Sequence, residues 1–100
     1  MSALIFDFET TGLLVRGAGR LDPRQPWPVS VAAVLLGPGN TEVARLYTLI
    51  RPQDWTVPQE ATNIHGITHA HALERGLPLR QAFGVLTAMM GEADAIVSHN

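Results

Sequence analysis

The chain has 100 residues, 46% of them hydrophobic and 16% charged, which allows a folded core and excludes an intrinsically disordered chain. This length fits one domain at most, and the formal net charge of −2 excludes binding to nucleic acid through an overall basic surface. Cysteine is absent, which excludes disulfides and thiolate metal sites. No apolar run has the length of a membrane span or the pattern of a signal peptide, so we expect a cytoplasmic domain without membrane contact.

The first half of the chain has the composition of a sheet. Residues 3–9 are apolar except for two acids, which predicts a strand buried on both faces. Residues 14–28 are rich in glycine, proline and arginine and predict an exposed, irregular connection, with a Pro-x-x-Pro docking motif as the alternative. The segments 29–36 and 42–50 predict an antiparallel hairpin around a turn at 37–40.

The second half of the chain changes to helical patterns. A proline in the first turn and a glycine after the last predict a short helix over 58–65. A turn with a further short helix is expected over 67–76, and apolar spacing of three and four residues predicts the longest helix over 78–93. A fourth strand begins at 95–100. This order predicts a mixed α/β fold, in which three antiparallel strands are followed by helices and then by a strand parallel to the first.

Two acids stand out in the first predicted strand. Asp7 and Glu9 are two residues apart, so their side chains leave the strand on the same face. Two like charges at close range oppose folding unless a cation or hydrogen-bond donors stabilise them. The pattern therefore indicates a site for a divalent cation, and two surface carboxylates on an edge strand are the alternative.

Residues 7–12 read Asp-Phe-Glu-Thr-Thr-Gly and are similar to the first motif of one enzyme family, the DnaQ-like (DEDD) 3′–5′ exonucleases. Residues 64–68 resemble its His-Gly-Ile segment, and residues 96–100 resemble the apolar opening of its second motif, ending in His-Asn. The order and spacing of the three segments make the resemblance specific. It implies a ribonuclease H-like fold, incomplete at the C-terminus, with residues 1–100 as the N-terminal part of a single exonuclease-like domain.

The resemblance also implies an activity and a site. The activity is hydrolysis of nucleic-acid 3′ ends to nucleoside monophosphates, in proofreading or repair, with two Mg²⁺ or Mn²⁺ ions as cofactors. Asp7 and Glu9 would be two of the four metal-binding acids and the catalytic residues of this chain, with Asp7 bridging both ions. The implied partners are a DNA 3′ end rather than RNA, and a polymerase. The implied substrate-binding residues are Thr10, Thr11, Gly12, His65, Gly66, His99 and Asn100.

The chain also departs from the family pattern. The remaining acids and the catalytic histidine of the family would follow Asn100, and His99 is interpreted as a positioning or packing residue rather than the base. We therefore expect the 100 residues alone to catalyse poorly. The alternatives are a non-catalytic module that binds nucleic-acid ends or a polymerase, a structural domain in which the acids cap turns, and a phosphotransferase.

Other conspicuous side chains have structural interpretations. His65, His69 and His71 are not spaced for one helical face, which argues against a zinc site. His69 and His71 are expected to face solvent, and packing near a helix end is the alternative for His65. Trp27 and Trp55 are expected to anchor loops, with base stacking as the alternative.

Overall fold

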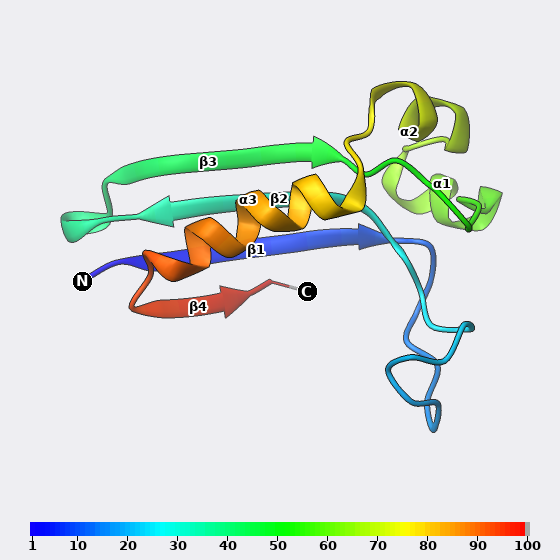
Figure 1. Ribbon diagram of the computed structural model, residues 1–100, viewed down its shortest axis with the longest axis horizontal. Helices are drawn as coiled ribbons and strands as arrows, with labels where there is room; N and C mark the ends of the chain where they lie inside the picture. Colours follow the sequence, from blue (N-terminus) through cyan, green and yellow to red (C-terminus); the bar gives the residue numbers. More distant parts are fainter. Residues whose placement is uncertain (100) are drawn as a thin grey trace.

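Four strands form one sheet in the computed structural model, which describes residues 1–99 (Figure 1). The strands are β1 (Ala3–Thr10), β2 (Pro28–Leu36), β3 (Glu42–Leu49) and β4 (Ala95–Ser98). Their order across the sheet is β3-β2-β1-β4. The pairs β1–β2 and β2–β3 are antiparallel, and β4 is parallel to β1. The predicted mixed sheet is therefore confirmed, and its topology is that of the ribonuclease H-like exonuclease fold.

Three α-helices connect β3 to β4. They are α1 (Gln59–His65), α2 (His69–Arg75) and α3 (Leu79–Gly91), and a short 3₁₀ turn, η1 (Pro38–Asn40), joins β2 to β3. The proline and glycine signals placed these boundaries well, because Pro58 and Pro78 are the N-caps of α1 and α3. Gly66 ends α1 with a φ of 80°, a conformation that favours glycine. No helix within residues 1–99 is long and apolar enough to cross a membrane.

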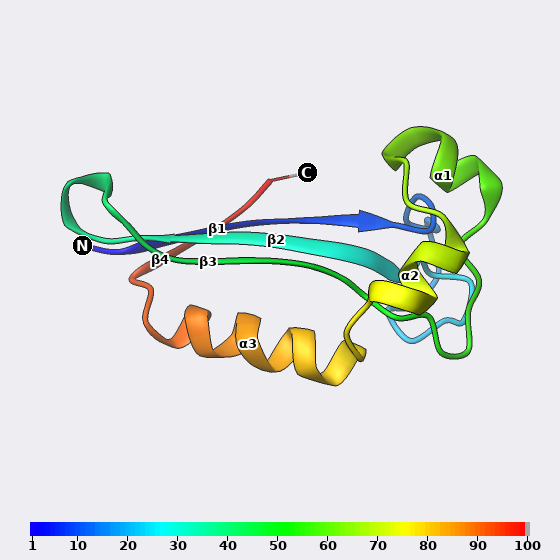
Figure 2. The same ribbon diagram turned by 90° about the horizontal axis from the view of Figure 1, so that it is seen from above.

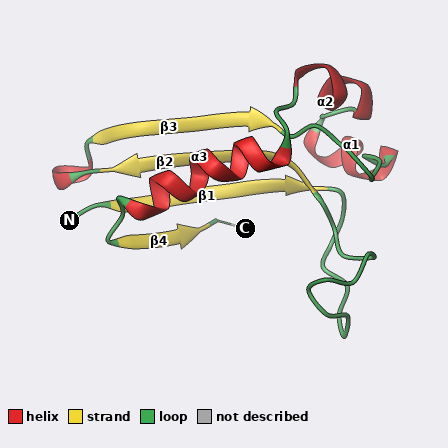
Figure 3. Cartoon of the chain, viewed as in Figure 1, coloured by secondary structure: helices red, strands yellow, loops and turns green. Residues whose placement is uncertain are grey.

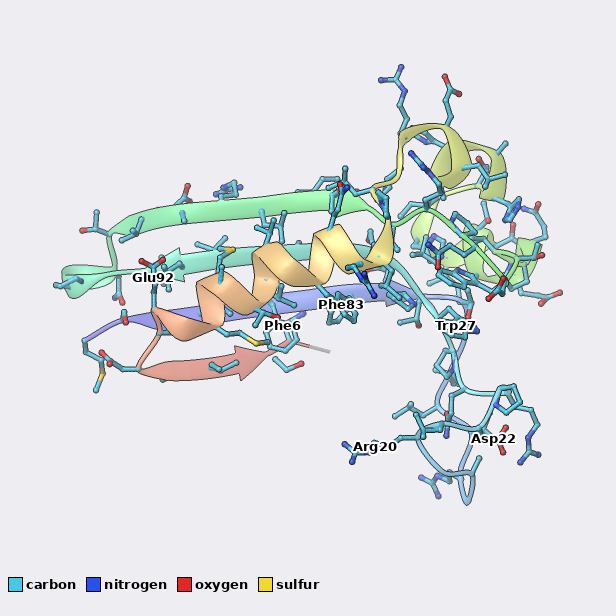
Figure 4. The ribbon with its side chains drawn as sticks, in the orientation of Figure 1. Phe6, Arg20, Asp22, Trp27, Phe83 and Glu92 are labelled. Atoms are coloured by element: carbon cyan, nitrogen blue, oxygen red, sulfur yellow. The ribbon has the colours of Figure 1, made fainter. Side chains whose placement is uncertain are left out.

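The main core lies between α3 and one face of the sheet (Figure 2). Leu4 and Phe6 of β1 face this helix because side chains alternate along a strand. Figure 4 shows Phe6 and Phe83 in the layer between α3 and β1. The buried residues of this core are Leu4, Val31, Ala33, Leu35, Ile50, Ala82, Leu86 and Met89.

The other face of the sheet is open, which corrects the expectation of a first strand buried on both faces. Ile5 of β1 is 39% exposed, and its parallel neighbour Val97 of β4 is 50% exposed. Tyr47 of β3 is 64% exposed on the same face. The physical reason is that α3 covers only one side of the sheet (Figure 2). β1 therefore presents Asp7 and Glu9 on a face that is open to ligands.

A second, smaller core holds α1 and α2 at the end of the sheet where β1 and β3 finish. Its buried residues are Val29, Leu49, Val57, Ala61, Ile67 and Ala72. Gly76 lets the chain after α2 pass close to the backbone directly after β3, since an added Cβ would collide with the Ala72 carbonyl and the Arg51 amide. This packing fixes α1 near the carboxyl end of β1.

Candidate active site

The two acids of β1 lie side by side on the open face of the sheet. Asp7 is paired across the sheet with Ala32 of β2, and Glu9 is paired with Ser30. Both partners have small side chains, so β2 leaves space beside the carboxylates. A cavity of about 480 Å³ occupies this space, and its lining residues are Asp7, Glu9, Ser30, Ala32, Tyr47, Ile64, His65 and Ile67. The structure thus brings the predicted acids and His65 to one cavity.

Two further hollows share walls with this cavity. One of about 630 Å³ is lined by Asp7, Phe8, Glu9, Thr10, Gly12, Leu13, Leu14, Pro26, Ser98 and His99. The other, of about 170 Å³, is lined by Phe8, Glu9, Thr10, Gly12, Leu13, Ala61, Ile64 and His65. Glu9 reaches all three hollows. A ligand at the acids can therefore also contact the turn after β1 and the end of α1.

The carboxylates keep most of their oxygen lone pairs free. Within residues 1–99, the one basic side chain in salt-bridge range of either acid is His99, whose Nδ1 lies 3.6 Å from Oδ2 of Asp7. The His99 backbone N–H donates to the Phe6 carbonyl at 2.8 Å, which places this residue beside β1. No arginine in the described part of the chain pairs with Asp7 or Glu9. The acids are therefore available to a cation.

A divalent cation fits this pair chemically. Carboxylate oxygens are the donors that Mg²⁺ and Mn²⁺ prefer, and two of them face one cavity. Among residues 1–99, no group of three or more His, Cys, Asp or Glu side chains is arranged to hold a metal. Asp7 and Glu9 can therefore supply part of a coordination shell, and water and substrate phosphate commonly complete such shells.

Thr10, the last residue of β1, and Thr11, the residue after it, form different hydrogen bonds. The Thr10 hydroxyl donates to the Gly12 carbonyl at 2.8 Å, and both residues line the hollows beside Glu9. Thr11 instead pairs with Trp27 at the far end of the following loop. Its N–H donates to the Trp27 carbonyl at 2.9 Å, and its Oγ1 accepts from the Trp27 N–H at 2.9 Å. Thr10 and Gly12 thus form the wall of the site, whereas Thr11 closes the loop.

His65 is held in a defined tautomer at the end of α1. Its Nδ1 accepts the N–H of Ile67 at 3.1 Å, so a neutral ring carries its proton on Nε2. This Nε2 is buried and has no hydrogen-bond partner within residues 1–99. Gly66 follows, and its N–H donates to the Thr62 carbonyl at 2.7 Å. A buried donor without a partner is suited to an oxygen atom of a bound ligand or of water, and His65 is one of the residues that line the cavity.

The expectations for the other histidines and for the tryptophans had different outcomes. His69 is half-buried and accepts the Val57 N–H on Nδ1 at 3.1 Å, so the expectation that it faces solvent was wrong. His71 is exposed, as expected. Trp27 and Trp55 stack on each other with ring centroids 4.5 Å apart and an angle of 4° between the rings, so they do anchor two loops. Asn100, the last residue expected at the site, lies outside the described residues.

Several residues at the cavities were not identified from the sequence, among them Leu13, Leu14, Ser30 and Tyr47. Leu13 and Leu14 are 92% and 79% exposed, and two leucines directly after the Gly12 turn were an available signal. Ser30 and Tyr47 reach the acids through the register of β2 and β3. No local pattern in the sequence gives that register.

Comparisons with known proteins agree with this arrangement. The family model described as Exonuclease (RNase T) matches residues 4–100. A moderately thermophilic exonuclease I from Methylocaldum szegediense has a similar structure, with a TM-score of 0.77, 24% identity, and coverage of 99% of this chain and 20% of that chain. Exonuclease I of E. coli in complex with a dT13 oligonucleotide gives a TM-score of 0.77 at 20% identity, with 99% and 20% coverage. An exonuclease I complex with SSB-Ct gives 0.76 at 20% identity, with the same coverage.

At this identity the structural likeness shows the fold. The chain spans about a fifth of the length of these exonuclease I chains. A search of curated proteins found no match. The family model nevertheless covers nearly the whole chain, and it confirms the resemblance to the DnaQ-like (DEDD) exonucleases. The protein therefore belongs to the exonuclease family that the RNase T model describes.

Proposed function

We propose that this chain is the N-terminal part of one metal-dependent 3′–5′ exonuclease domain, which releases nucleoside monophosphates from DNA 3′ ends in proofreading or repair. The observation that carries the proposal is the position of Asp7 and Glu9, which share cavities with Thr10, Gly12 and His65 and are paired with no arginine among residues 1–99. Exonuclease I, which has the same fold, is known in complex with a dT13 oligonucleotide, and this supports DNA as the polymer. A proofreading role would make a polymerase the protein partner.

In this proposal Asp7 and Glu9 hold two Mg²⁺ or Mn²⁺ ions together with acids outside the described residues. Such ions, when bound, supply an activated water molecule and stabilise negative charge on the scissile phosphate. The carboxylates would keep the ions near the end of β1, where the backbone pairs with β2 as far as Thr10 and with β4 as far as Phe6. This rigid placement is what a reaction based on positioning requires.

The terminal nucleotide would lie between the turn after β1 and the end of α1. His65 would donate its Nε2 proton to an oxygen of the nucleotide, because that donor is buried and has no other partner within residues 1–99. Thr10 and Gly12 would contact the sugar or phosphate, and the exposed Leu13 would cover an apolar face of the base. These contacts orient the last phosphodiester bond toward the acids.

Binding of Mn²⁺ tests the metal site directly. We expect Asp7→Asn to lower Mn²⁺ affinity by at least about tenfold, because it replaces a charged ligand with a neutral side chain of nearly the same shape. Isothermal titration of the wild type and the variant measures this change. Asp54→Asn is the matched control, since Asp54 is exposed and forms no ion pair within residues 1–99. Equal Mn²⁺ affinity in wild type and Asp7→Asn would refute the metal site.

A second substitution tests the role of His65. An asparagine at this position can still accept the Ile67 N–H, whereas it lacks the Nε2 donor. We expect His65→Asn to keep the fold and to weaken binding of thymidine monophosphate by about 1 kcal/mol, the usual value of one hydrogen bond. NMR titration measures the affinity, and unchanged binding would assign His65 to packing alone.

One observation favours the non-catalytic alternative. Within residues 1–99, the structure places no third acid beside Asp7 and Glu9. A binding module would hold a 3′-labelled single strand equally well with Mg²⁺ or with EDTA and would not shorten it. An exonuclease would release labelled mononucleotides only when the metal is present. Denaturing gel analysis of the labelled strand separates these two functions.

A further inference from the structure

The loop over residues 13–27 projects from the sheet directly after the site (Figure 1). It contains no helix or strand (Figure 3). Three of the seven basic residues of the chain, Arg16, Arg20 and Arg24, lie in it, together with one acid, Asp22. In a chain with a net charge of −2, this is a local concentration of positive charge. A segment of this composition next to a nuclease site requires a physical explanation.

The single acid of the loop is fully occupied by one arginine. Asp22 accepts hydrogen bonds from Arg24 Nε at 3.0 Å, from Arg24 Nη2 at 2.8 Å and from the Arg24 backbone N–H at 2.8 Å. These bonds hold the pKa of Asp22 below its usual value. Arg16 and Arg20 are exposed and form no ion pair within residues 1–99. In Figure 4, the Arg20 side chain leaves the loop on the side opposite to Asp22. Two positive charges therefore remain available.

The loop is also held in a defined shape. The side-chain amide of Gln25 accepts the Val15 N–H at 2.9 Å. Its Nε2 group lies 3.2, 3.1 and 3.2 Å from the carbonyls of Val15, Ala18 and Gly19. These residues flank Arg16 and directly precede Arg20. The backbone that carries Arg16 and Arg20 is thus ordered before any ligand binds, which lowers the conformational entropy lost on binding.

The loop and the acid pair share one continuous surface. Pro26 lines the hollow of about 630 Å³ that contains Asp7 and Glu9. It also lines a second hollow of about 340 Å³, whose other lining residues are Arg20, Leu21, Asp22, Pro23, Gln25 and Trp27. Trp27, supported from behind by the stacked Trp55, keeps 37% of its surface exposed. A polymer with one end at the acids can therefore extend past Pro26 and reach Trp27 and Arg20.

We propose that the loop 13–27 is a second binding surface for the same substrate and holds single-stranded nucleic acid behind the 3′ end. Arg16 and Arg20 bind backbone phosphates, and Trp27 stacks on an unpaired base. Arginine and an exposed aromatic ring are the groups that hold single strands without reading their sequence. A duplex keeps its bases stacked inside and cannot use the tryptophan. This inference rests on the proposed exonuclease function, since it names where the rest of that substrate lies.

The test measures binding in EDTA, so that no metal contributes. A fluorescein-labelled oligothymidylate of about 15 nucleotides, close to the upper site size of small single-strand binding folds, is titrated with the chain at several salt concentrations. For Arg16→Ala/Arg20→Ala, we expect the slope of log affinity against log salt to fall by about 1.4, which is about 0.7 for each of two lost phosphate contacts. Arg16→Lys/Arg20→Lys keeps both charges and should keep the slope.

Arg51→Ala/Arg80→Ala is the matched control. Both arginines are exposed and form no ion pair within residues 1–99, and neither lines the hollows described above. The control removes the same amount of positive charge, but at positions outside the loop. We therefore expect it to leave the slope nearly unchanged. An equal loss in both double variants would overturn the proposal in favour of diffuse charge, and no loss in the loop variant would overturn it as well. Binding of a polyglutamate peptide in place of the oligonucleotide would also overturn it and would indicate a protein partner.

Tryptophan fluorescence provides an independent readout of the stacking contact. Trp27 and Trp55 are the two tryptophans of the chain, so emission reports this platform alone. We expect oligothymidylate to quench the wild type and to leave Trp27→Phe largely unchanged, and equal quenching of both would refute the stacking contact. The outcomes are separable from those of the metal site. Equal Mn²⁺ affinity of the wild type and Asp7→Asn, together with an intact loop effect, would refute the metal site alone. Weaker Mn²⁺ affinity of Asp7→Asn without a loop effect would refute the loop surface alone.

Discussion

The strand β1 and the loop 13–27 follow each other in the chain with a short turn between them, but they are held in place by different forces. β1 is fixed by burial, because Leu4 is completely buried and Phe6 packs against the core beneath α3. The loop has no buried apolar residue of the main core and is fixed by hydrogen bonds in which the Gln25 and Thr11 side chains accept backbone N–H groups. The acid pair lies near the end of β1, just before the chain passes from the strand held by burial to the loop held by hydrogen bonds.

This difference predicts where the molecule is rigid. Burial of apolar surface contributes to the global free energy of unfolding, so β1 should open only when the whole sheet opens. Hydrogen bonds on an exposed loop each contribute little and exchange with water, so the loop should open locally. A site at this junction would have acids fixed by the sheet on one side and, on the other, a loop that is shaped by hydrogen bonds but opens more easily than the sheet. The following substitutions test that division.

Leu4→Ala should have the largest effect on stability. Leu4 is 0% exposed, and removal of a fully buried leucine typically costs about 3 kcal/mol, because the neighbours do not fill the cavity. Urea denaturation measures the change. Ile5→Ala is the natural control on the open face, where 39% exposure predicts a cost of about 1 kcal/mol. Equal costs for the two substitutions would show that the open face is covered in solution.

Gln25→Ala should come next and should act locally. It removes the amide that holds Val15, Ala18 and Gly19, so local opening of the loop should become easier by about 1–2 kcal/mol. Under native conditions, trypsin cleavage after Arg16 should then become about tenfold faster, whereas the melting temperature should change little. Gln53→Ala, at an exposed position without a side-chain hydrogen bond in residues 1–99, is the control. A lowered melting temperature with unchanged cleavage would mean that the loop unfolds together with the sheet.

The division between strand and loop also explains what could be predicted from the sequence. The strand at 3–10 and the helix limits at Pro58, Gly66 and Pro78 follow from local chemistry: apolar composition, fixed φ angles and tolerance of a left-handed conformation. Asp7 and Glu9 could be identified because alternation along a strand is a local rule. These features need no knowledge of the rest of the fold.

Contacts between distant segments could not be predicted in this way. The open face around Ile5 depends on which side of the sheet α3 covers, and a strand of apolar residues carries no sign of that choice. His69 is half-buried because its Nδ1 meets the Val57 amide from the preceding connection. Thr11 closes the loop through Trp27, sixteen positions further along the chain. Each of these contacts depends on how elements approach one another in space.

Thr11→Val should have a smaller effect than Gln25→Ala. Valine has nearly the same shape as threonine but cannot accept the Trp27 N–H, which then loses one hydrogen bond of about 1 kcal/mol. Hydrogen exchange of the Trp27 amide, followed by NMR, should become about fivefold faster. Thr10→Val is the control, because the Thr10 hydroxyl donates to Gly12 and forms no hydrogen bond with Trp27. Unchanged exchange in Thr11→Val would mean that the tryptophan stack alone closes the loop.

The smallest expected effect is that of pH on the Asp22–Arg24 pair. The Arg24 side chain, and then its backbone N–H, hold the pKa of Asp22 below the usual value. A lowered pKa in the folded state means that the contribution of this pair is fully present above the usual pKa of aspartate and is lost as pH falls through the lowered value. NMR titration should show Asp22 titrating lower in the wild type than in Arg24→Ala. Glu42, whose pKa is lowered by Arg45 instead, should titrate identically in both proteins and is the internal control. Because the pair is exposed, a high salt concentration should weaken it. A normal Asp22 titration in the wild type would leave Arg24 free in solution, and the loop would then offer three arginines to a phosphate backbone instead of two.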